Sequence, residues 1–237
     1  MRVVLVPGFT QTASSWDGVA PVVRERHEVV VAPIRLRTTF EETARALGDA
    51  GAGVYVGYSM GARLCLRLAL DRPEVVRGLV LVSGTAGITD PAERDERIAS
   101  DEALARSVER DGVEAFLRRW LAQPMFASVP HDAPGLRDRH LLPAGYLAGC
   151  LRRLGTGRME PLWGRLRELR MPVALVTGKQ DAKYERLAGL MLERMGPQVE
   201  HVRLDCGHAV PLEQPAVLGG FVLAFVDRHF GSGQARA

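Results

Sequence analysis

Lysine is nearly absent from this sequence of 237 residues. Lys179 and Lys183 are the only two, so arginine supplies almost all of the positive charge, and the formal net charge at pH 7 is only +3. Acidic residues interrupt the basic ones, as in the Arg-Asp-Glu-Arg stretch at 94–97. Proteins that bind nucleic acid usually gather their basic residues into a patch, so we expect no nucleic-acid partner.

Cysteine and long apolar runs are also scarce. Cys65, Cys150 and Cys206 are odd in number and widely spaced, which argues against a disulfide framework or a zinc site and favours reduced thiols in the cytoplasm. We interpret Cys206 as a small buried residue, although it lies close to His208. The apolar run at 3–6 is too short for a signal peptide or a membrane span, so we expect no membrane insertion.

Recognisable cofactor motifs are missing as well. The pair Gly51-x-Gly53 precedes an apolar run, whereas a phosphate-binding loop follows one. We therefore predict no metal and no cofactor, and the oligomeric state stays open.

What the sequence does contain is a regular alternation of short apolar runs with helical stretches. Nearly continuous apolar runs are typical of parallel strands that are covered on both faces. Their alternation with helices predicts an α/β protein with a doubly wound, mostly parallel sheet. The expected strands are Arg2–Val6, Glu28–Ala32, Val54–Gly57, Leu79–Ser83, Val173–Thr177 and Glu200–Leu204.

This rhythm breaks after the strand at 79–83. Residues 88–159 show helical periods at 91–107, 112–121, 135–141 and 146–154 but no convincing strand. A single crossover needs far fewer residues. We therefore interpret 88–159 as a helical lid over the edge where α/β sheets bind ligands, with 1–87 and 160–237 as the core. The alternative is a set of ordinary crossover helices. The small, polar residues 231–237 are expected to be disordered.

The most informative motif is Gly57-x-Ser59-x-Gly61. An apolar run precedes it and an amphipathic helical stretch, 63–70, follows it. This is the context of a nucleophile elbow, a strained strand-to-helix turn that exposes a serine hydroxyl above the end of a sheet. The glycines are needed because a side chain at either position would collide with neighbouring backbone.

A serine nucleophile needs a histidine to take its proton and an acid to hold that histidine. In this fold the partners follow in the order Ser, Asp or Glu, His. Asp181 comes just after the expected strand at 173–177, and His208 comes just after the next strand, so both should meet Ser59 at one sheet edge. Asp205 is a rival acid, but it is too near His208 in sequence to reach behind the ring easily.

Two backbone N–H groups should form an oxyanion hole. One is expected from Met60, directly after the nucleophile at the start of a helix. The other is expected from Phe9, because the turn at Pro7-Gly8 follows the first strand and exposes the next N–H. A simple turn there is compatible with this role.

Over nearly its whole length the chain resembles the α/β-hydrolase superfamily. More narrowly, it resembles the 2-succinyl-6-hydroxy-2,4-cyclohexadiene-1-carboxylate synthases of the menaquinone pathway. The stretches that carry this likeness are 57–63 (GYSMGAR), 93–97 (ERDER), 120–128 (WLAQPMFAS), 161–163 (PLW) and 178–184 (GKQDAKY). That family releases pyruvate from a cyclohexene precursor and leaves a conjugated diene, with the triad abstracting a proton.

Two departures from the superfamily pattern stand out. Pro7-Gly8 replaces the usual His-Gly, so we expect the oxyanion loop to be held differently. The strand at 2–6 corresponds to the fold's third strand, so the usual leading hairpin is expected to be missing.

The resemblance also implies a set of substrate-binding residues. Arg63 lies one helical turn after Ser59 and therefore shares its face, where it can meet a substrate carboxylate. The two aromatic residues of the lid could instead be core packing, and its two arginines could be surface charges. The residues implied are Tyr58, Arg63, Arg97, Trp120, Phe126 and Arg139.

Three functions stay open at this point. The first is a lyase acting on a small anionic polycarboxylate, because arginines converge on the elbow. The second is an ester or thioester hydrolase that uses the same triad covalently. The third is a ligand receptor without catalysis, which a complete set of triad residues disfavours.

Overall fold

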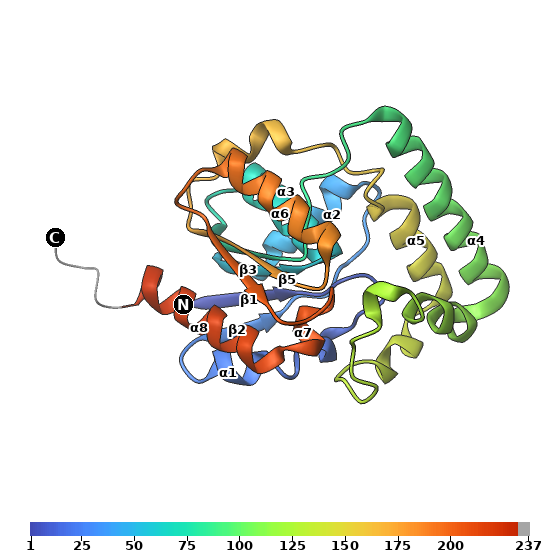
Figure 1. Cartoon of the computed structure of the whole chain (residues 1–237), viewed down its shortest axis with the longest axis horizontal. Coiled ribbons are helices and arrows are strands. Elements are labelled where there is room, and N and C mark those ends of the chain that lie inside the picture. The colour runs from blue at the N-terminus through green and yellow to red at the C-terminus, as the bar shows by residue number, and fades with distance from the viewer. Residues whose placement is uncertain (232–237) are drawn as a thin grey trace.

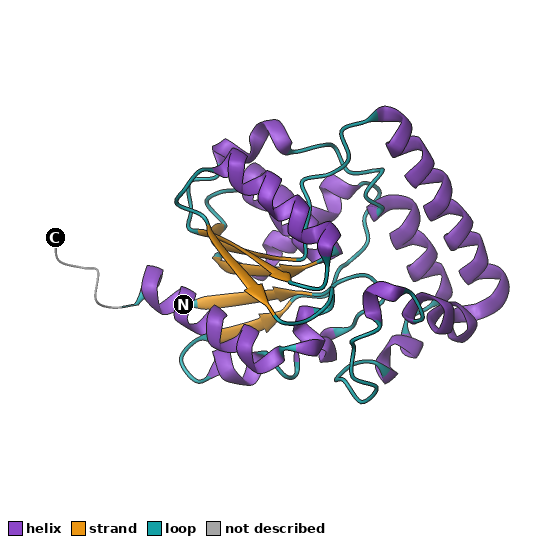
Figure 2. Cartoon of the chain, viewed as in Figure 1, coloured by secondary structure: helices purple, strands orange, loops and turns teal. Residues whose placement is uncertain are grey.

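The computed structural model describes residues 1–231, so all but the first residue of the expected disordered tail lies outside the described residues. Within them the strands form one six-stranded sheet in the order β2-β1-β3-β4-β5-β6 (Figures 1 and 2). All five pairings are parallel. The prediction of a doubly wound, mostly parallel sheet is confirmed. The strands are β1 Arg2–Val6, β2 Glu28–Val31, β3 Gly53–Tyr58, β4 Val76–Val82, β5 Val173–Gly178 and β6 Glu200–Leu204.

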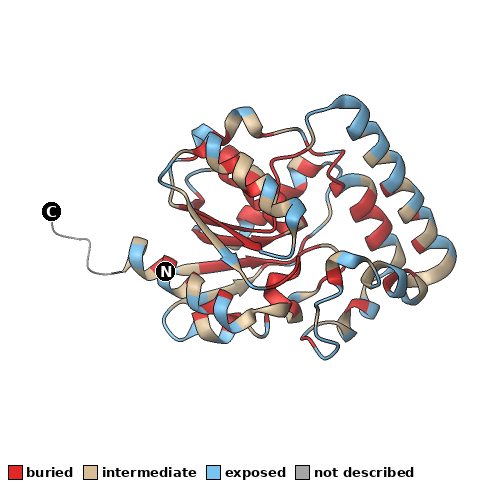
Figure 3. Cartoon of the chain, viewed as in Figure 1, coloured by how far each residue is buried: buried red, intermediate tan, exposed pale blue. Residues whose placement is uncertain are grey.

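The sheet is apolar on both faces because helices cover both. Side chains alternate between the faces, so Val4 and Val6 pack with helices α2, α3 and α6, while Val3 and Leu5 pack with α1 and α8. Figure 3 shows most of the sheet as buried. This is why the strands appear in the sequence as uninterrupted apolar runs. The helices around the sheet are α1 Ala20–Arg24, α2 Phe40–Leu47, α3 Met60–Asp71, α6 Ala182–Met195, α7 Val210–Glu213 and α8 Pro215–Phe230.

A helical segment separates β4 from β5. Helix α4 and helix α5 lie beyond the carboxyl ends of the strands, at the right of Figure 1. The two helices expected at 91–107 and 112–121 are one element with a kink at Gly112, whose φ is +82°. The stretch expected as a helix at 135–141 forms only a 3₁₀ turn. The segment contains α4 Pro91–Leu121, α5 Ala144–Leu154 and the 3₁₀ turns η3 Pro124–Phe126 and η4 Arg137–Leu141.

The remaining 3₁₀ turns are η1 Ala13–Trp16, η2 Gly48–Ala50 and η5 Trp163–Glu168. Within residues 1–231, no helix combines the length and the apolar character that a membrane crossing requires.

The strand order places the site. The chain runs from β1 outward to β2 and then returns to the other side of β1 with β3. The carboxyl ends of β1 and β3 therefore flank a topological switch point, the usual ligand crevice of an open α/β sheet. The loop after β1 contains Phe9, and the turn after β3 contains Ser59.

Candidate active site

Ser59 stands alone between β3 and α3, in a backbone conformation that L-residues rarely adopt. Its φ and ψ are +51° and −106°. The turn closes only because Gly57 and Gly61, two residues to either side of the serine, lack side chains. A Cβ on Gly57 would lie 2.5 Å from the carbonyl oxygen of Gly61, and a Cβ on Gly61 would lie 2.4 Å from that of Val6. The strained serine and the two close approaches are the geometry of a nucleophile elbow.

Ser59, His208 and Asp181 lie in one hydrogen-bonded row. The Nε2 atom of His208 is 3.2 Å from Oγ of Ser59, and its Nδ1 atom is 2.6 Å from Oδ2 of Asp181. The imidazole is only 2% exposed. Asp205, the rival acid, is exposed at the surface. The structure thus brings Asp181, and not Asp205, against the ring.

Two side chains outside the expected set hold the loop that carries His208. Glu213 accepts hydrogen bonds from the N–H groups of Gly207 at 2.7 Å and Ala209 at 2.9 Å. Ser83, fully buried at the end of β4, donates its hydroxyl to the carbonyl oxygen of His208 at 3.0 Å. His208 is therefore held both by hydrogen bonds to its imidazole ring and by hydrogen bonds to the backbone of its loop.

The two expected oxyanion donors lie beside this row. Met60 begins α3, so its N–H has no partner in the preceding turn of the helix. Neither its N–H nor that of Phe9 donates to another group among the described residues. Both residues line the cavity above Ser59. That these two N–H groups hold a developing negative charge stays a prediction.

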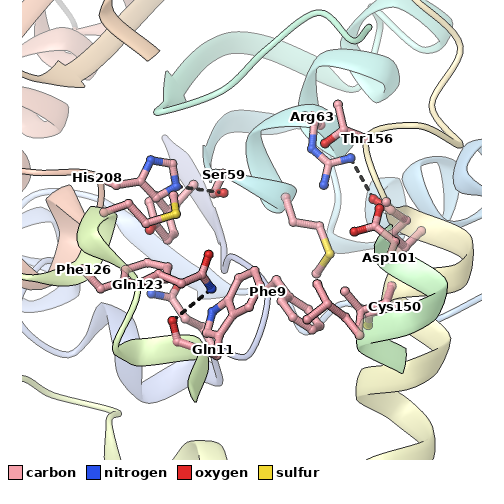
Figure 4. Close-up of a pocket in the computed structure, with 18 of the residues that line it drawn as sticks. Phe9, Gln11, Ser59, Arg63, Asp101, Gln123, Phe126, Cys150, Thr156 and His208 are labelled. Carbon is pink, nitrogen blue, oxygen red and sulfur yellow. Dashed lines mark hydrogen bonds between the residues drawn. The ribbon is translucent and has the colours of Figure 1, made fainter. Parts of the chain in front are cut away.

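A cavity of about 370 Å³ extends from Ser59 toward α4 and α5. Figure 4 shows Ser59 and His208 at one side of it and Arg63, Thr156 and Asp101 at the other. Its lining has four cationic side chains against two carboxylates, so the cavity favours an anion. The charged residues are Arg63, Arg97, Arg139, Lys183, Asp101 and Asp181.

Arg63 is the most unusual of these charges. Its residue is 7% exposed, and Nη1 donates to the carbonyl oxygen of Leu154 at 2.7 Å. Within residues 1–231 no carboxylate forms an ion pair with it. Burial lowers its pKa from 12.5 to about 10. An unpaired buried cation beside a cavity is a ready partner for a carboxylate ligand.

Arg97 has a protein partner. Its Nε donates to both carboxylate oxygens of Asp101, at 2.9 and 3.0 Å. The Asp101 side chain is only 4% exposed, and burial raises its pKa. Arg97 itself is partly exposed and lines the cavity. Its exposure agrees with the expectation of a surface charge, and its place in the cavity lining agrees with the expectation of a substrate-binding residue.

Arg139 is not a surface charge. The residue is 2% exposed, its Nη1 donates to Oγ1 of Thr10 at 2.8 Å, and its Nε has no partner among the described residues. Burial lowers its pKa. The surface alternative is wrong for this residue, because the segment before α5 folds back onto the loop after β1.

The expected aromatic residues both pack and line the cavity. The Trp120 ring meets Phe9 edge-on at 5.1 Å and lies 5.9 Å from Phe126. Its indole N–H is buried without a partner in the described chain. The rings of Tyr58 and of Tyr184 lie 5.4 and 4.5 Å from the imidazole of His208. Tyr184 was not expected from the sequence, and nor were Gln11, Asp101 or Thr156.

No group of three or more metal-ligating side chains occurs in the described part of the chain.

The sequence model of the Alpha/beta hydrolase family matches residues 3–219. The chain belongs to this family.

One curated relative points to a narrower group. A putative 2-succinyl-6-hydroxy-2,4-cyclohexadiene-1-carboxylate synthase from Bacillus subtilis is 36% identical over 178 residues, which are 72% of this chain and 64% of the relative. The match therefore spans slightly less than two thirds of the length of that relative.

Two solved structures share the fold. MenH from S. aureus superposes with a TM-score of 0.87 at 24% identity, over 97% of this chain and 94% of that one. A malate-bound thermophilic esterase from Thermogutta terrifontis superposes with a TM-score of 0.75 at 22% identity, over 97% and 90%. The likeness to MenH and to an esterase alike shows a common fold and does not choose a reaction.

Proposed function

We propose that this chain is a lyase that eliminates pyruvate from a cyclohexene polycarboxylate, the 2-succinyl-6-hydroxy-2,4-cyclohexadiene-1-carboxylate synthase reaction of menaquinone biosynthesis. The name of the Bacillus relative supports this substrate. The observation that carries the proposal is Arg63, a buried cation that forms no ion pair with a carboxylate of residues 1–231 and that faces Ser59 across the cavity. A hydrolase for neutral esters has no use for such a charge.

In the proposed reaction Ser59 acts as the base. His208 takes the hydroxyl proton, Asp181 holds the resulting imidazolium, and the serine oxygen removes a proton from the ring. The electron pair of that C–H bond forms a new double bond, and the ring C–O bond to the enolpyruvyl group breaks. The leaving group gains a proton and becomes pyruvate, and the ring is left as a conjugated diene.

As the ring proton leaves, negative charge develops on the oxygen of the substrate carbonyl next to that ring carbon. The N–H groups of Phe9 and Met60 would stabilise this charge. Arg63, Arg97 and Arg139 would bind its carboxylates, with Tyr58, Trp120 and Phe126 against its ring. The elimination involves no net oxidation, so it calls for no redox cofactor. We also propose that residues 88–159 serve as a lid on a core of 1–87 and 160–237, in a protein of the cytoplasm.

The test is pyruvate release from the cyclohexene precursor by the wild type and by Ser59→Ala. The precursor can decay without an enzyme, so only release above that of the variant counts. Rapid release that depends on Ser59 supports the lyase. Release no faster than that of the variant contradicts it.

The second candidate is an ester or thioester hydrolase, which the hydrogen-bonded row of Ser59, His208 and Asp181 would serve equally well. Turnover of p-nitrophenyl esters with a burst of acyl-enzyme, and no serine-dependent pyruvate, would favour it.

A further inference from the structure

The loop after β1 must hold its shape without the usual histidine. Pro7 has neither an N–H nor a polar side chain. Yet the loop carries Phe9, whose N–H must point at one place to serve as an oxyanion donor. Other residues of this chain therefore fix the loop.

Gln11 holds Gly8 on both sides. Its side-chain oxygen Oε1 accepts the N–H of Gly8 at 3.0 Å, and its backbone N–H donates to the carbonyl oxygen of Gly8 at 3.2 Å. Gln11 is 6% exposed, so water does not compete strongly for these bonds.

The second of these bonds bears directly on Phe9. The carbonyl of Gly8 and the N–H of Phe9 belong to one planar trans peptide and point in opposite directions. Holding the oxygen on Gln11 therefore turns the N–H of Phe9 away from Gln11. The side-chain bond acts on the preceding peptide, between Pro7 and Gly8, because that peptide contains the N–H of Gly8. Together the two bonds hold the peptides on both sides of the Gly8 Cα.

Close packing around Gly8 and Thr10 also restricts the conformation of this loop. A Cβ on Gly8 would lie 2.7 Å from the ring of Tyr58, so the chain passes directly over that ring. Thr10 has a φ of +64°, a conformation that is costly for a β-branched residue. The bond from Arg139 to its Oγ1 helps to hold it there.

From these contacts we infer that Gln11 is a positioning residue: its side-chain amide holds the N–H of Gly8 and thereby fixes the turn in which the next peptide presents the Phe9 N–H to the reacting oxygen. The inference depends on the proposed role of Phe9 in the site, but not on the identity of the substrate. Both an elimination and an ester hydrolysis would need this donor.

The test compares Gln11→Met with the wild type. Methionine keeps the length of the side chain but lacks the amide oxygen. The probe is a p-nitrophenyl alkylphosphonate, which Ser59 attacks. The Oγ–P bond forms, p-nitrophenolate leaves, His208 takes the serine proton, and the phosphoryl oxygen enters the oxyanion hole.

We expect phosphonylation to slow by about tenfold to a hundredfold, less than or near the loss for a deleted oxyanion donor. Affinity for succinate, which needs no oxyanion hole, should stay within about twofold, and the melting temperature should change little. Gln198→Met is the matched control. It removes an amide that donates to the carbonyl oxygen of Met195 at the end of α6, away from the residues that line the cavity, and it should label at nearly the wild-type rate.

An unchanged phosphonylation rate in Gln11→Met would overturn the inference. So would parallel losses of labelling and succinate affinity, which would indicate a general collapse of the cavity or a direct substrate contact. Labelling that never occurs in the wild type would also overturn it. Normal labelling in a wild type that releases no pyruvate would instead reject the proposed lyase and leave the role of Gln11 intact.

Discussion

Replacing Arg63 by methionine should stabilise the protein while weakening its binding of anions. The guanidinium is buried and has no carboxylate partner among the described residues. A pKa of about 10 in place of 12.5 means that keeping this group charged at neutral pH costs about 3 kcal/mol, an order-of-magnitude figure. Because the folded pKa is lowered, the penalty is fully present at neutral pH and fades only as the pH rises above 10.

Part of this gain is offset. Methionine leaves the carbonyl oxygen of Leu154 without its donor and removes the cation from the ring of Phe40, 5.8 Å away. These losses should cost about 1–2 kcal/mol. We expect a net stabilisation of about 1–2 kcal/mol, or a rise in melting temperature of about 2–8 °C for a domain of this size.

The assay is thermal unfolding by circular dichroism with and without succinate. Succinate should raise the melting temperature of the wild type at neutral pH and affect Arg63→Met much less. kcat/KM for the anionic precursor should fall by about tenfold or more in the variant. A variant that is less stable than the wild type, or that gains as much from succinate, would refute the idea of a stored, unpaired charge.

Three further predictions concern the triad, a buried carboxyl group and the thiols. In the pyruvate-release assay, Ser59→Ala and His208→Ala should each lower kcat by several orders of magnitude, because both residues act directly on the proton. Asp181→Ala should lower kcat by less, and wild-type activity in that variant would assign the acid role to another residue. Burial raises the pKa of Asp101, so its stabilising contribution is present below the ordinary value of 3.8 and is lost as the pH rises through the folded value. Asp101→Asn should therefore gain stability relative to the wild type in urea as the pH rises from 3.8, and a difference independent of pH would contradict this. All three cysteines are buried, and burial raises the thiol pKa of Cys150 and of Cys206 to about 12. Ellman's reagent should therefore react with none of the three in the native protein and with all three after unfolding. Rapid reaction of a thiol in the native protein would contradict the burial.

The fold and the row at its centre could be predicted because each depends on a local pattern. Apolar runs mark the strands, and Ser59, Asp181 and His208 each lie within a short loop or turn after the end of a strand. Since the strands are parallel, their carboxyl ends meet at one edge, and position in sequence is enough to bring these residues together.

The contacts that hold the site in place, such as those of Ser83 and Arg139, could not be predicted from a local sequence pattern. Ser83 and His208 are 125 residues apart, and Thr10 and Arg139 are 129 apart. A serine at the end of a strand or an arginine in a polar stretch is ordinary, and only the way the chain folds reveals its partner. Arg139 was for this reason compatible with a surface charge in sequence, whereas the 3₁₀ turn η4 buries it.

The most direct test of the proposed lyase is to follow pyruvate and the conjugated diene together during turnover of the cyclohexene precursor by wild type and Ser59→Ala. The lyase reaction predicts that the two products appear in equal amounts, at a rate that falls to the spontaneous level in the variant. Wild-type release of pyruvate and diene at the rate of the variant, with rapid hydrolysis of esters by the same preparation, would contradict it.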